Sequence, residues 1–467
     1  MTYTMTIGGE GVPGEAHFGV VNPATEEVFA EAPECSRAEL DTAMEAAAQA
    51  FPAWARDEAG RRQALAACGE AIQARVQELA QVLTREQGKP ITKAGGEVFG
   101  AAFTFLHAAG LEIPVETVQD DASARIEVRP RPLGVVAAIT PWNYPVLIGM
   151  AKVAPALLAG NTVVLKPSPF TPLSTLLLGE VVREVLPPGV FNVVSGGDDL
   201  GRWITEHPAV RKISLTGSVE TGKKVAAAAA SDLKRVTLEL GGNDPALVLP
   251  DADPAEVAQK LFWSAFENSG QICSAVKRVY AHEQVAEPLI EALAEIARSV
   301  KTGDGFDPAS QLGPINNRPQ FERVSELVDD ARKSGARVVA GGERLGERGY
   351  FFCPTLLADV DNGSRIVDEE QFGPALPVVR YRDLDEAIAR ANATHFGLGA
   401  SVWTGDLERG TEVAARLECG TSWVNTHLGI VPHAPFGGWK WSGLGVENGK
   451  WGLLGLTDLQ VIHVSRS

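Results

Sequence analysis

The chain has 467 residues, of which 45% are hydrophobic and 22% charged, as in an ordinary globular protein of about two or three domains. Its net charge of −17 disfavours binding to nucleic acids and to anionic membrane surfaces. No window is apolar enough for a membrane helix, and the first residues lack the basic start and apolar core of a secretory signal. Five scattered cysteines argue against a disulfide framework, so we expect a cytoplasmic protein.

Helical periodicity dominates from Arg37 to about Phe105, where apolar residues recur at intervals of three and four. Ser36 is placed to cap the first helix, and Gly88 to end the second. The polar stretch that follows, up to Pro132, alternates between apolar and polar residues and predicts an exposed hairpin or arm.

Strands and helices alternate from Gly134 onward. VVAAIT, NTVVLKP, VFNVVSG, KISLTG and RVTLELGG are short runs rich in β-branched residues, and helical stretches separate them. This alternation predicts crossover units and a parallel sheet. A second such series follows Ile272, so we expect two α/β domains that face each other across a cleft.

Two glycine motifs differ in their context. Gly9, Gly11 and Gly14 match G-x-G-x-x-G, but no helix follows them, so we interpret this match as a surface turn. In LTGSVETG, by contrast, a strand runs into Gly217 and Ser218 and then into a helix. That turn suits either an anion site at the start of the helix or a tight connection, and spacing alone leaves both open.

Lys166 ends an apolar strand and is followed by a proline-rich exit. A lysine at the carboxyl end of a strand often touches a ligand in open α/β sheets. A solvated lysine at a strand terminus is the simpler alternative.

Cys273 is the best candidate for a nucleophile. Gly270 and the polar residues around it leave backbone room beside the sulfur, whereas Cys68 and Cys353 suit buried apolar filler. His282 is the single histidine within thirty residues, so a protease-like Cys–His pair has no local support.

Glu239 and Asn143 have the chemistry of a base and of an oxyanion donor. Glu239 follows an apolar strand and precedes two glycines, so it suits a general base or a loop cap. Asn143 lies in a proline-stiffened turn, where its amide suits an oxyanion or the turn backbone. The histidines and cysteines lack metal-ligand spacing, so we predict that the chain has no metal site.

Eight segments, in this order, together resemble the aldehyde dehydrogenase superfamily over nearly the whole chain. They are PWNYP (141–145), LKPSPFTP (165–172), TGSVETG (216–222), LELGG (238–242), GQIC (270–273), EQFGP (370–374), WVN (423–425) and PFGGWKWSGLGVENG (435–449).

The resemblance implies oxidation of an aldehyde to its carboxylic acid with NAD(P)+. Cys273 then attacks the aldehyde carbon to form a thiohemiacetal, and the Asn143 amide with the Cys273 backbone N–H holds the oxyanion. Loss of hydride gives a thioester, which a water activated by Glu239 hydrolyses.

The resemblance also implies a set of cofactor contacts: Lys166, Ser168, Gly217, Ser218, Thr221, Trp142, Glu370 and Phe372. Members that prefer NAD commonly carry a glutamate three residues after the lysine, and Pro169 stands there instead. NADP therefore stays open. We favour NAD, because Lys166 and Ser168 alone do not make a dedicated phosphate clamp.

The fold implied is α/β, with two Rossmann-type domains on parallel sheets and a small oligomerisation arm. The expected divisions are residues 1–112 and 133–240 for NAD(P), 241–440 for catalysis, and 113–132 and 441–467 for the arm. The arm would pair its hairpin with the C-terminal strand, and we expect a homodimer or a homotetramer.

The resemblance places two walls on a substrate tunnel. One wall comprises Tyr144, Leu147, Ile148 and Ala151, and the other His427, Leu428, Ile430 and Phe436. Semialdehyde dehydrogenases often have an arginine where Ala151 stands, so succinate semialdehyde is disfavoured. The lining suits an apolar aliphatic or aromatic aldehyde.

Two other activities suit the same scaffold. A CoA-acylating dehydrogenase would pass the acyl group to a thiol, but such members commonly lack the glutamate that is present here as Glu239. A thiol esterase would use Cys273 and Asn143, but it would leave Lys166 and Glu370 without a purpose.

Overall fold

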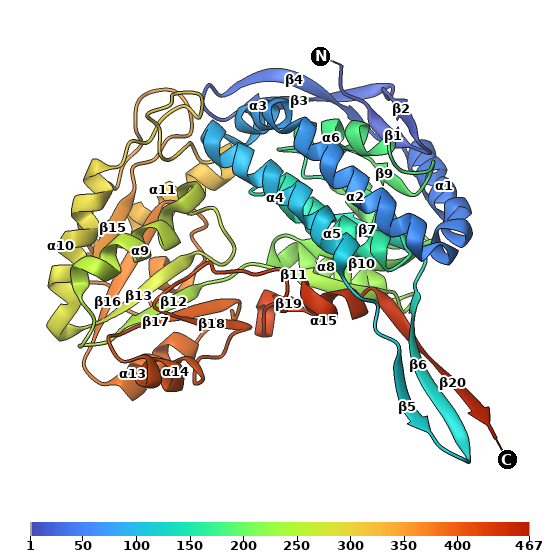
Figure 1. Ribbon diagram of the computed structural model, residues 1–467. Helices are drawn as coiled ribbons and strands as arrows, with labels where there is room; N and C mark the ends of the chain where they lie inside the picture. The colour runs from blue at the N-terminus through green and yellow to red at the C-terminus, as the bar shows by residue number, and fades with distance from the viewer. Residues whose placement is uncertain (1, 467) are drawn as a thin grey trace.

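The structure is a computed structural model that describes residues 2–466. Two α/β lobes lie side by side, each built on its own sheet, and a three-stranded arm extends from the first lobe (Figure 1). A hairpin of β3 (Ala16–Asn22) and β4 (Glu27–Glu34) runs over the first lobe toward the second.

The sheet of the first lobe has eight strands in the order β19-β11-β10-β7-β8-β9-β1-β2. The strands from β11 to β9 are parallel, whereas β19, β1 and β2 pair antiparallel at the edges. The strands are β1 (Met5–Ile7), β2 (Glu10–Val12), β7 (Val135–Ile139), β8 (Thr162–Lys166), β9 (Phe191–Val193), β10 (Val210–Thr216), β11 (Arg235–Glu239) and β19 (Gly443–Leu444). The predicted crossover series is therefore confirmed, and the antiparallel edges come from segments outside it. Gly9 and Gly11 lie in the β1–β2 hairpin, as the absence of a following helix indicated.

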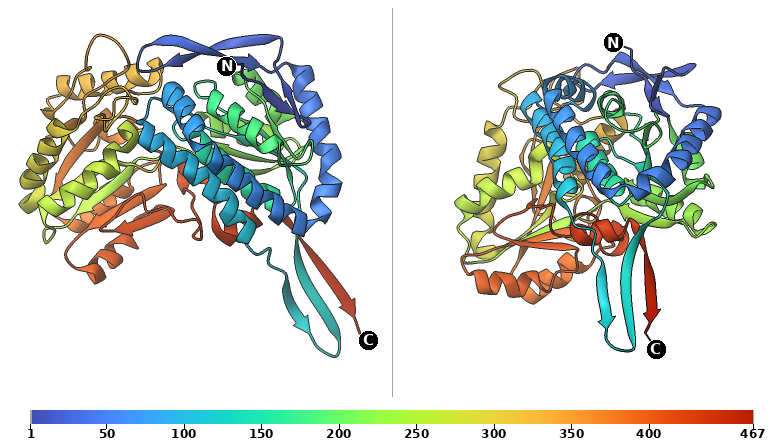
Figure 2. Two further views of the ribbon diagram at one scale, coloured as in Figure 1. Left: turned by 45° about the horizontal axis from the view of Figure 1, so that its top comes forward. Right: turned by 45° about the vertical axis from the view of Figure 1, so that its right-hand side comes forward.

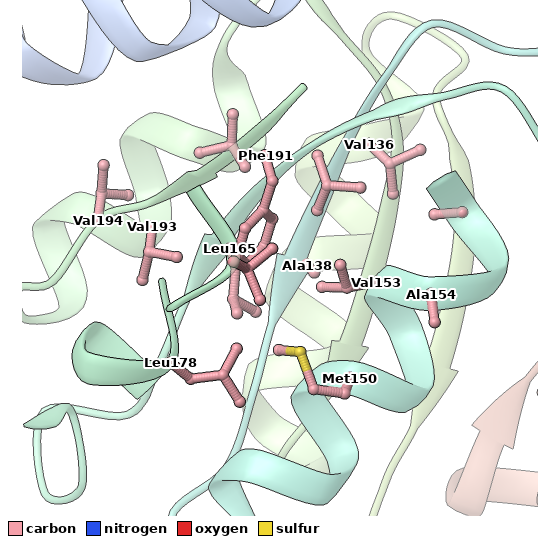
Figure 3. Close-up of a cluster of buried hydrophobic side chains, with 14 of the residues drawn as sticks. Val136, Ala138, Met150, Val153, Ala154, Leu165, Leu178, Phe191, Val193 and Val194 are labelled. Atoms are coloured by element: carbon pink, nitrogen blue, oxygen red, sulfur yellow. The ribbon is translucent and has the colours of Figure 1, made fainter. Parts of the chain in front are cut away.

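Helices pack on this sheet and bury its apolar side chains. They are α1 (Arg37–Arg56), α2 (Glu58–Ala74), α3 (Val76–Gln87), α4 (Ile91–Gly110), α5 (Pro145–Leu158), α6 (Leu173–Arg183), α7 (Asp198–Glu206), α8 (Val219–Ala230) and α15 (Gly449–Leu454). Figure 3 shows Met150 and Val153 of α5 and Leu178 of α6 against Leu165 and Phe191 of the sheet, all of them buried. Because α5 is fixed by this core, the segment just before it is held in place too.

The second lobe has a seven-stranded sheet in the order β14-β15-β16-β13-β12-β17-β18, in which only the β14–β15 pair is antiparallel. Its strands are β12 (Asp244–Val248), β13 (Val276–His282), β14 (Arg337–Ala340), β15 (Thr355–Ala358), β16 (Ala375–Tyr381), β17 (Gly399–Trp403) and β18 (Thr421–Val424). Its helices are α9 (Pro254–Phe266), α10 (Glu283–Ser299), α11 (Arg318–Lys333), α12 (Arg365–Asp368), α13 (Leu384–Asn392) and α14 (Leu407–Ala414). Short 3-10 turns cover Glu267–Gly270 and Lys440–Ser442.

The arm consists of β5 (Glu116–Asp120), β6 (Ala124–Pro132) and β20 (Thr457–Ser465). β6 is the middle strand, and it pairs antiparallel with both β5 and β20. The arm projects away from both lobes (Figure 2). The expected pairing of the hairpin with the C-terminal strand is therefore present.

The helical region at the start of the chain differs from the prediction in one detail. Ser36 does cap α1, within a capping box that includes Glu39. The second predicted helix, however, is broken at Arg75 into α2 and α3, so Gly88 ends the third helix, with a φ of 98°. The apolar periodicity runs through this break, and spacing therefore did not reveal it.

Candidate active site

The predicted site residues of the first lobe gather at the carboxyl ends of its parallel strands. Asn143 follows β7, Lys166 ends β8, Gly217 follows β10 and Glu239 ends β11. Parallel strands bring their carboxyl ends to one edge of the sheet, which is where α/β folds place ligands. Cys273, from the second lobe, comes just before β13.

The segment before Cys273 has an unusual backbone. Asn268, Ser269 and Gly270 have φ values of 52°, 55° and 72°, all in the left-handed region. A side chain on Gly270 would overlap the carbonyl of Gly373, so only glycine fits there. Ser269 donates its hydroxyl to the Gly313 carbonyl at 2.7 Å. Such strain persists only where surrounding contacts hold it, and it clusters at functional sites.

Asn143 is buried and reaches this segment. Its side-chain amide donates to the backbone carbonyl of Gln271 at 2.9 Å, and Asn268 donates to the Asn143 carbonyl at 3.2 Å. This bond uses one N–H of the amide. Its acceptor, Gln271, is two residues before Cys273 in the chain. The arrangement suits a donor to an oxyanion that forms at Cys273.

A buried ion pair that the sequence did not reveal holds the Asn143 segment. Lys89 contacts Glu97 at 2.5 Å and donates to the Asn143 carbonyl at 2.9 Å, and its ammonium lies 3.6 Å from the Tyr144 ring centroid. Glu97 accepts from the amide of Leu147 at 3.2 Å, at the start of α5. The pair therefore fixes both the amide donor and part of the expected tunnel wall.

Glu239 is 4% exposed, and neither of its carboxylate oxygens accepts a hydrogen bond from a described residue. Burial, reinforced by the charge of Glu447, raises the pKa of Glu239 well above its usual range, while Lys152 acts in the opposite direction. Lys152 contacts Glu447 at 2.5 Å. The sequence did not predict a role for Lys152 or Glu447, because these two paired residues are distant in sequence. An unpaired buried carboxyl with a raised pKa has the properties of a general base.

The Cys273 thiol is surrounded by opposing charges. Burial raises its pKa to about 12; Lys277 lowers that pKa, and the carboxylates of Glu239, Glu370 and Asp244 raise it. Lys277 was also missed, although a lysine inside the apolar run of β13 is a signal that was available.

The turn after β10 leads into the N-terminus of α8, a feature that suits a phosphate group. Ser218 caps α8, and its hydroxyl accepts from the Thr221 amide at 3.2 Å, so both residues and Gly217 lie at the positive end of the helix. A side chain on Gly222 would come within 2.6 Å of Leu240, so glycine allows α8 to approach the chain after β11. This arrangement fits the pyrophosphate of NAD(P).

The other expected cofactor residues frame the same edge. Lys166 is buried, and its one hydrogen bond to a described residue is to the Pro167 carbonyl at 3.3 Å, which leaves donors for a ligand. Ser168 is also buried. The Trp142 and Phe372 rings meet edge to face at 5.2 Å. These residues fit a nucleotide, although they come from different lobes.

The expected tunnel residues have mixed environments. Tyr144, Leu147, Ile148, Ala151, Leu428 and Phe436 are half-buried, and Ile430 is exposed. His427 is buried, and its Nε2 lies 2.7 Å from the carbonyl of Ser274, the residue that follows Cys273. Ala151 also borders a cavity of about 20 Å³ beside Lys152 and Glu447.

Among residues 2–466, no group of three histidine, cysteine or acidic side chains is arranged to hold a metal ion. Within the same residues, the helices are too short or too polar to cross a membrane.

Known proteins resemble this chain over nearly its whole length. The model of the aldehyde dehydrogenase family matches residues 12–462. Retinaldehyde dehydrogenase 3 of Rattus norvegicus is 40% identical over 457 residues, which cover 96% of this chain and 89% of that protein. Aldehyde dehydrogenase of Bacillus cereus, solved as an NAD+ complex, has a TM-score of 0.97 and 37% identity, with 100% and 97% of the chains covered. An NADP-dependent enzyme of E. coli has a TM-score of 0.96 and 38% identity, with 99% and 98% covered.

The fold and the strand-end site thus define an α/β oxidoreductase with two Rossmann-like lobes. The chain belongs to the aldehyde dehydrogenase family, and it is an NAD(P)-dependent enzyme that oxidises aldehydes to carboxylic acids.

Proposed function

We propose that the chain oxidises an apolar aliphatic or aromatic aldehyde through a thiohemiacetal and a thioester on Cys273. NAD(P)+, when bound, would supply the acceptor for the hydride. Cys273 reacts as the thiolate, its thiol proton passing to solvent: Sγ bonds to the aldehyde carbon as the C=O π bond breaks, and the Asn143 amide with the Cys273 backbone N–H donates to the oxygen that becomes negative. Glu239 then takes a proton from the water that attacks the thioester carbon, and the C–S bond breaks to release the acid and the Cys273 thiolate.

The observation that carries this proposal is the unpaired, buried carboxyl of Glu239. Burial of a carboxyl without a hydrogen-bond donor costs free energy. We therefore infer that Glu239 acts on a reacting water and does not make a structural contact. It also favours hydrolysis over transfer of the acyl group to CoA.

The test is reduction of NAD+ and of NADP+ at 340 nm with aliphatic, aromatic and carboxylate-bearing aldehydes. We expect turnover with the apolar aldehydes, and none in the Cys273→Ala variant. The highest kcat/KM with short charged semialdehydes would contradict the substrate class. If no aldehyde alone reduced either nucleotide, but an ester or an aldehyde with CoA were turned over, the proposed reaction would be contradicted.

NAD is the proposed cofactor, because the Asp198 carboxylate is near enough to Lys166 to oppose the shift of its pKa, despite Pro169. Gly201 of α7 lies against Lys166, since a side chain on it would be 3.9 Å from Lys166 Cε. Asp198 is three residues earlier, on the neighbouring face of the same helix, and it is exposed. Burial lowers the pKa of Lys166 to about 8, and Asp198 opposes that shift. A carboxylate there accepts from a ribose hydroxyl and repels a 2′-phosphate.

We further propose the cofactor, catalytic and arm divisions given by the resemblance, and a homodimer or homotetramer assembled through the arm. Large apolar side chains are exposed on both outer strands of the arm, namely Val118 of β5 and Leu459, Val461 and Val464 of β20. Exposed apolar edges of this kind favour association with another chain. Light scattering should give two or four times the 49.5 kDa of the chain, and Val461→Lys should lower that mass.

A cytoplasmic location is also proposed, because all five cysteines are free, which suits a reducing compartment. Fractionation of the source cells, with detection of the protein by antibody, tests this.

A further inference from the structure

Lys277 is the second residue of β13, and it is buried. Its ammonium donates to the backbone carbonyls of Ile272 at 2.8 Å and of Cys273 at 2.9 Å. It also lies 3.4 Å from Oε1 of Glu370, on the segment before β16. One side chain thus contacts both the nucleophile residue and the carboxylate that is expected to face the cofactor.

Glu370 is held from a second side by backbone. The Gly242 amide donates to its Oε1 at 3.0 Å. Gly241 has no side chain, and a Cβ built there would overlap Glu370 Oε2. The carboxylate therefore rests between the Lys277 ammonium and the two glycines that follow Glu239.

We propose that Lys277 is a positioning residue that joins Cys273 and Glu370 into one unit, through hydrogen bonds and an ion pair, and supplies positive charge to the nucleophile. This rests on the proposed role of Cys273 as nucleophile. The Lys277 ammonium donates to two carbonyls and is ion-paired with one carboxylate, an arrangement that fixes its charge next to the backbone of Cys273.

The charges around the sulfur decide how this unit acts. Lys277 lowers the pKa of Cys273, whereas Glu239, Glu370 and Asp244 raise it. His427, packed behind Ser274, stays neutral, because burial lowers its pKa to about 3. Glu370 therefore partly cancels the charge that Lys277 presents to the thiol.

Alkylation of Cys273 by iodoacetamide measures the reactive thiolate without aldehyde or nucleotide. Lys277→Met removes the positive charge, so we expect the alkylation rate at pH 8.5 to fall about three- to tenfold, with its pH profile moved to higher pH. Peptide mass spectrometry assigns the site of reaction, and the Cys273→Ala variant gives the background from the other cysteines. An unchanged rate and profile would overturn the proposal.

Glu370→Gln should act in the opposite direction and speed alkylation several-fold, because it removes the charge that cancels Lys277. This variant keeps the side-chain shape, so it tests the unit even where Lys277→Met does not fold. In the Lys277→Met background, Glu370→Gln should have a smaller effect, because the ammonium that ties this carboxylate to the Cys273 residue is gone. Additive effects of the two substitutions would show that the residues act independently, and would overturn the coupling.

Lys234 provides a matched control in the first lobe. It is buried, donates to the carbonyls of Thr205 at 2.8 Å and His207 at 2.9 Å, and lies 3.4 Å from Asp232. Lys234→Met removes the same kind of contacts just before β11, at the end of that strand opposite Glu239, so it should leave the alkylation profile unchanged. An equal fall in the alkylation rate in Lys234→Met and Lys277→Met would mean that a general loosening of the structure causes it, and would overturn the proposal. Because the assay needs no turnover, failure here is distinct from failure of aldehyde oxidation.

Discussion

The backbone amide of Gly217 donates to the backbone carbonyl of Glu239 at 3.0 Å. This bond continues the ladder in which Thr216 of β10 lies opposite Glu239 of β11. The turn that fits the pyrophosphate and the buried carboxyl thus occupy adjacent positions on neighbouring strands. The proposed cofactor turn and the proposed base are held by the same pair of strands, so the sheet register sets their separation.

Glu239→Gln should stop acid release while sparing the steps before it. The amide is nearly the same size as the carboxyl, but it does not take a proton from water, so kcat should fall about 10²–10⁴-fold. Stopped-flow measurement at 340 nm should still show a burst of about one NADH per active site. Loss of the burst together with kcat would show instead that Glu239 acts before the thioester forms.

The pH dependence of thioester hydrolysis should follow the raised pKa of Glu239. A base is active only when deprotonated, so the rate should rise with pH until that raised pKa is passed. Glu447→Gln removes the charge that raises the pKa and frees Lys152, which lowers it. The rising limb should therefore move to lower pH, as measured by kcat from pH 6 to 10. A rising limb that does not move would show that Glu447 does not affect the pKa of the base.

The strand-end residues were readable from the sequence, because local patterns define them. An apolar β-branched run predicts a buried strand, and the polar residue that ends the run must lie at the sheet edge. Glu239, Lys166 and Gly217 are all of this kind, and the structure places them at that edge. Asn143 follows the same logic, one turn after β7.

The charged residues behind the site were not readable, because their partners come from distant segments. Lys89 and Asn143 are 54 residues apart, and Lys152 and Glu447 are 295 apart. Nothing in the periodicity of α4 distinguishes Glu97, which caps the start of α5, from a solvated glutamate. Single-sequence patterns describe each element, whereas these contacts depend on how the elements pack.

Lys89→Met should destabilise the first lobe. It leaves the Glu97 carboxylate buried without its cation, and removal of one partner of a buried pair costs about 3–5 kcal/mol. The free energy of unfolding from urea titration, followed by tryptophan fluorescence, checks this. Lys93, whose side chain is half exposed and pairs with Glu267 at 3.1 Å, is the control. Lys93→Met should change the free energy by less than about 1 kcal/mol.

Asp198→Asn should relax the preference for NAD. The amide keeps the size and the hydrogen bonding but loses the charge that repels a 2′-phosphate, so kcat/KM with NADP+ should rise about tenfold relative to NAD+. Asp199 is the next residue of α7 and pairs instead with Arg202 at 3.1 Å. Asp199→Asn therefore serves as the control and should leave the ratio unchanged. An equal shift in both variants would point to the general charge of the helix terminus.

Leu147→Trp tests which side of the site receives the aldehyde. Leu147 lies against Gly100 of α4, where a Cβ on the glycine would be 3.2 Å from Leu147 Cδ1, so a larger side chain has no space toward α4. The indole should obstruct a bulky aromatic aldehyde and lower its kcat/KM about ten- to hundredfold, since overpacking costs about 1–3 kcal/mol. Acetaldehyde is small enough to pass, so its kcat/KM should change little, and the KM for the nucleotide should stay constant.

Leu407→Trp, at an exposed leucine of α14, controls for the added indole. A uniform loss for both aldehydes would mean that the substitution disturbs Asn143, four residues earlier, and that Leu147 does not line the path of the substrate.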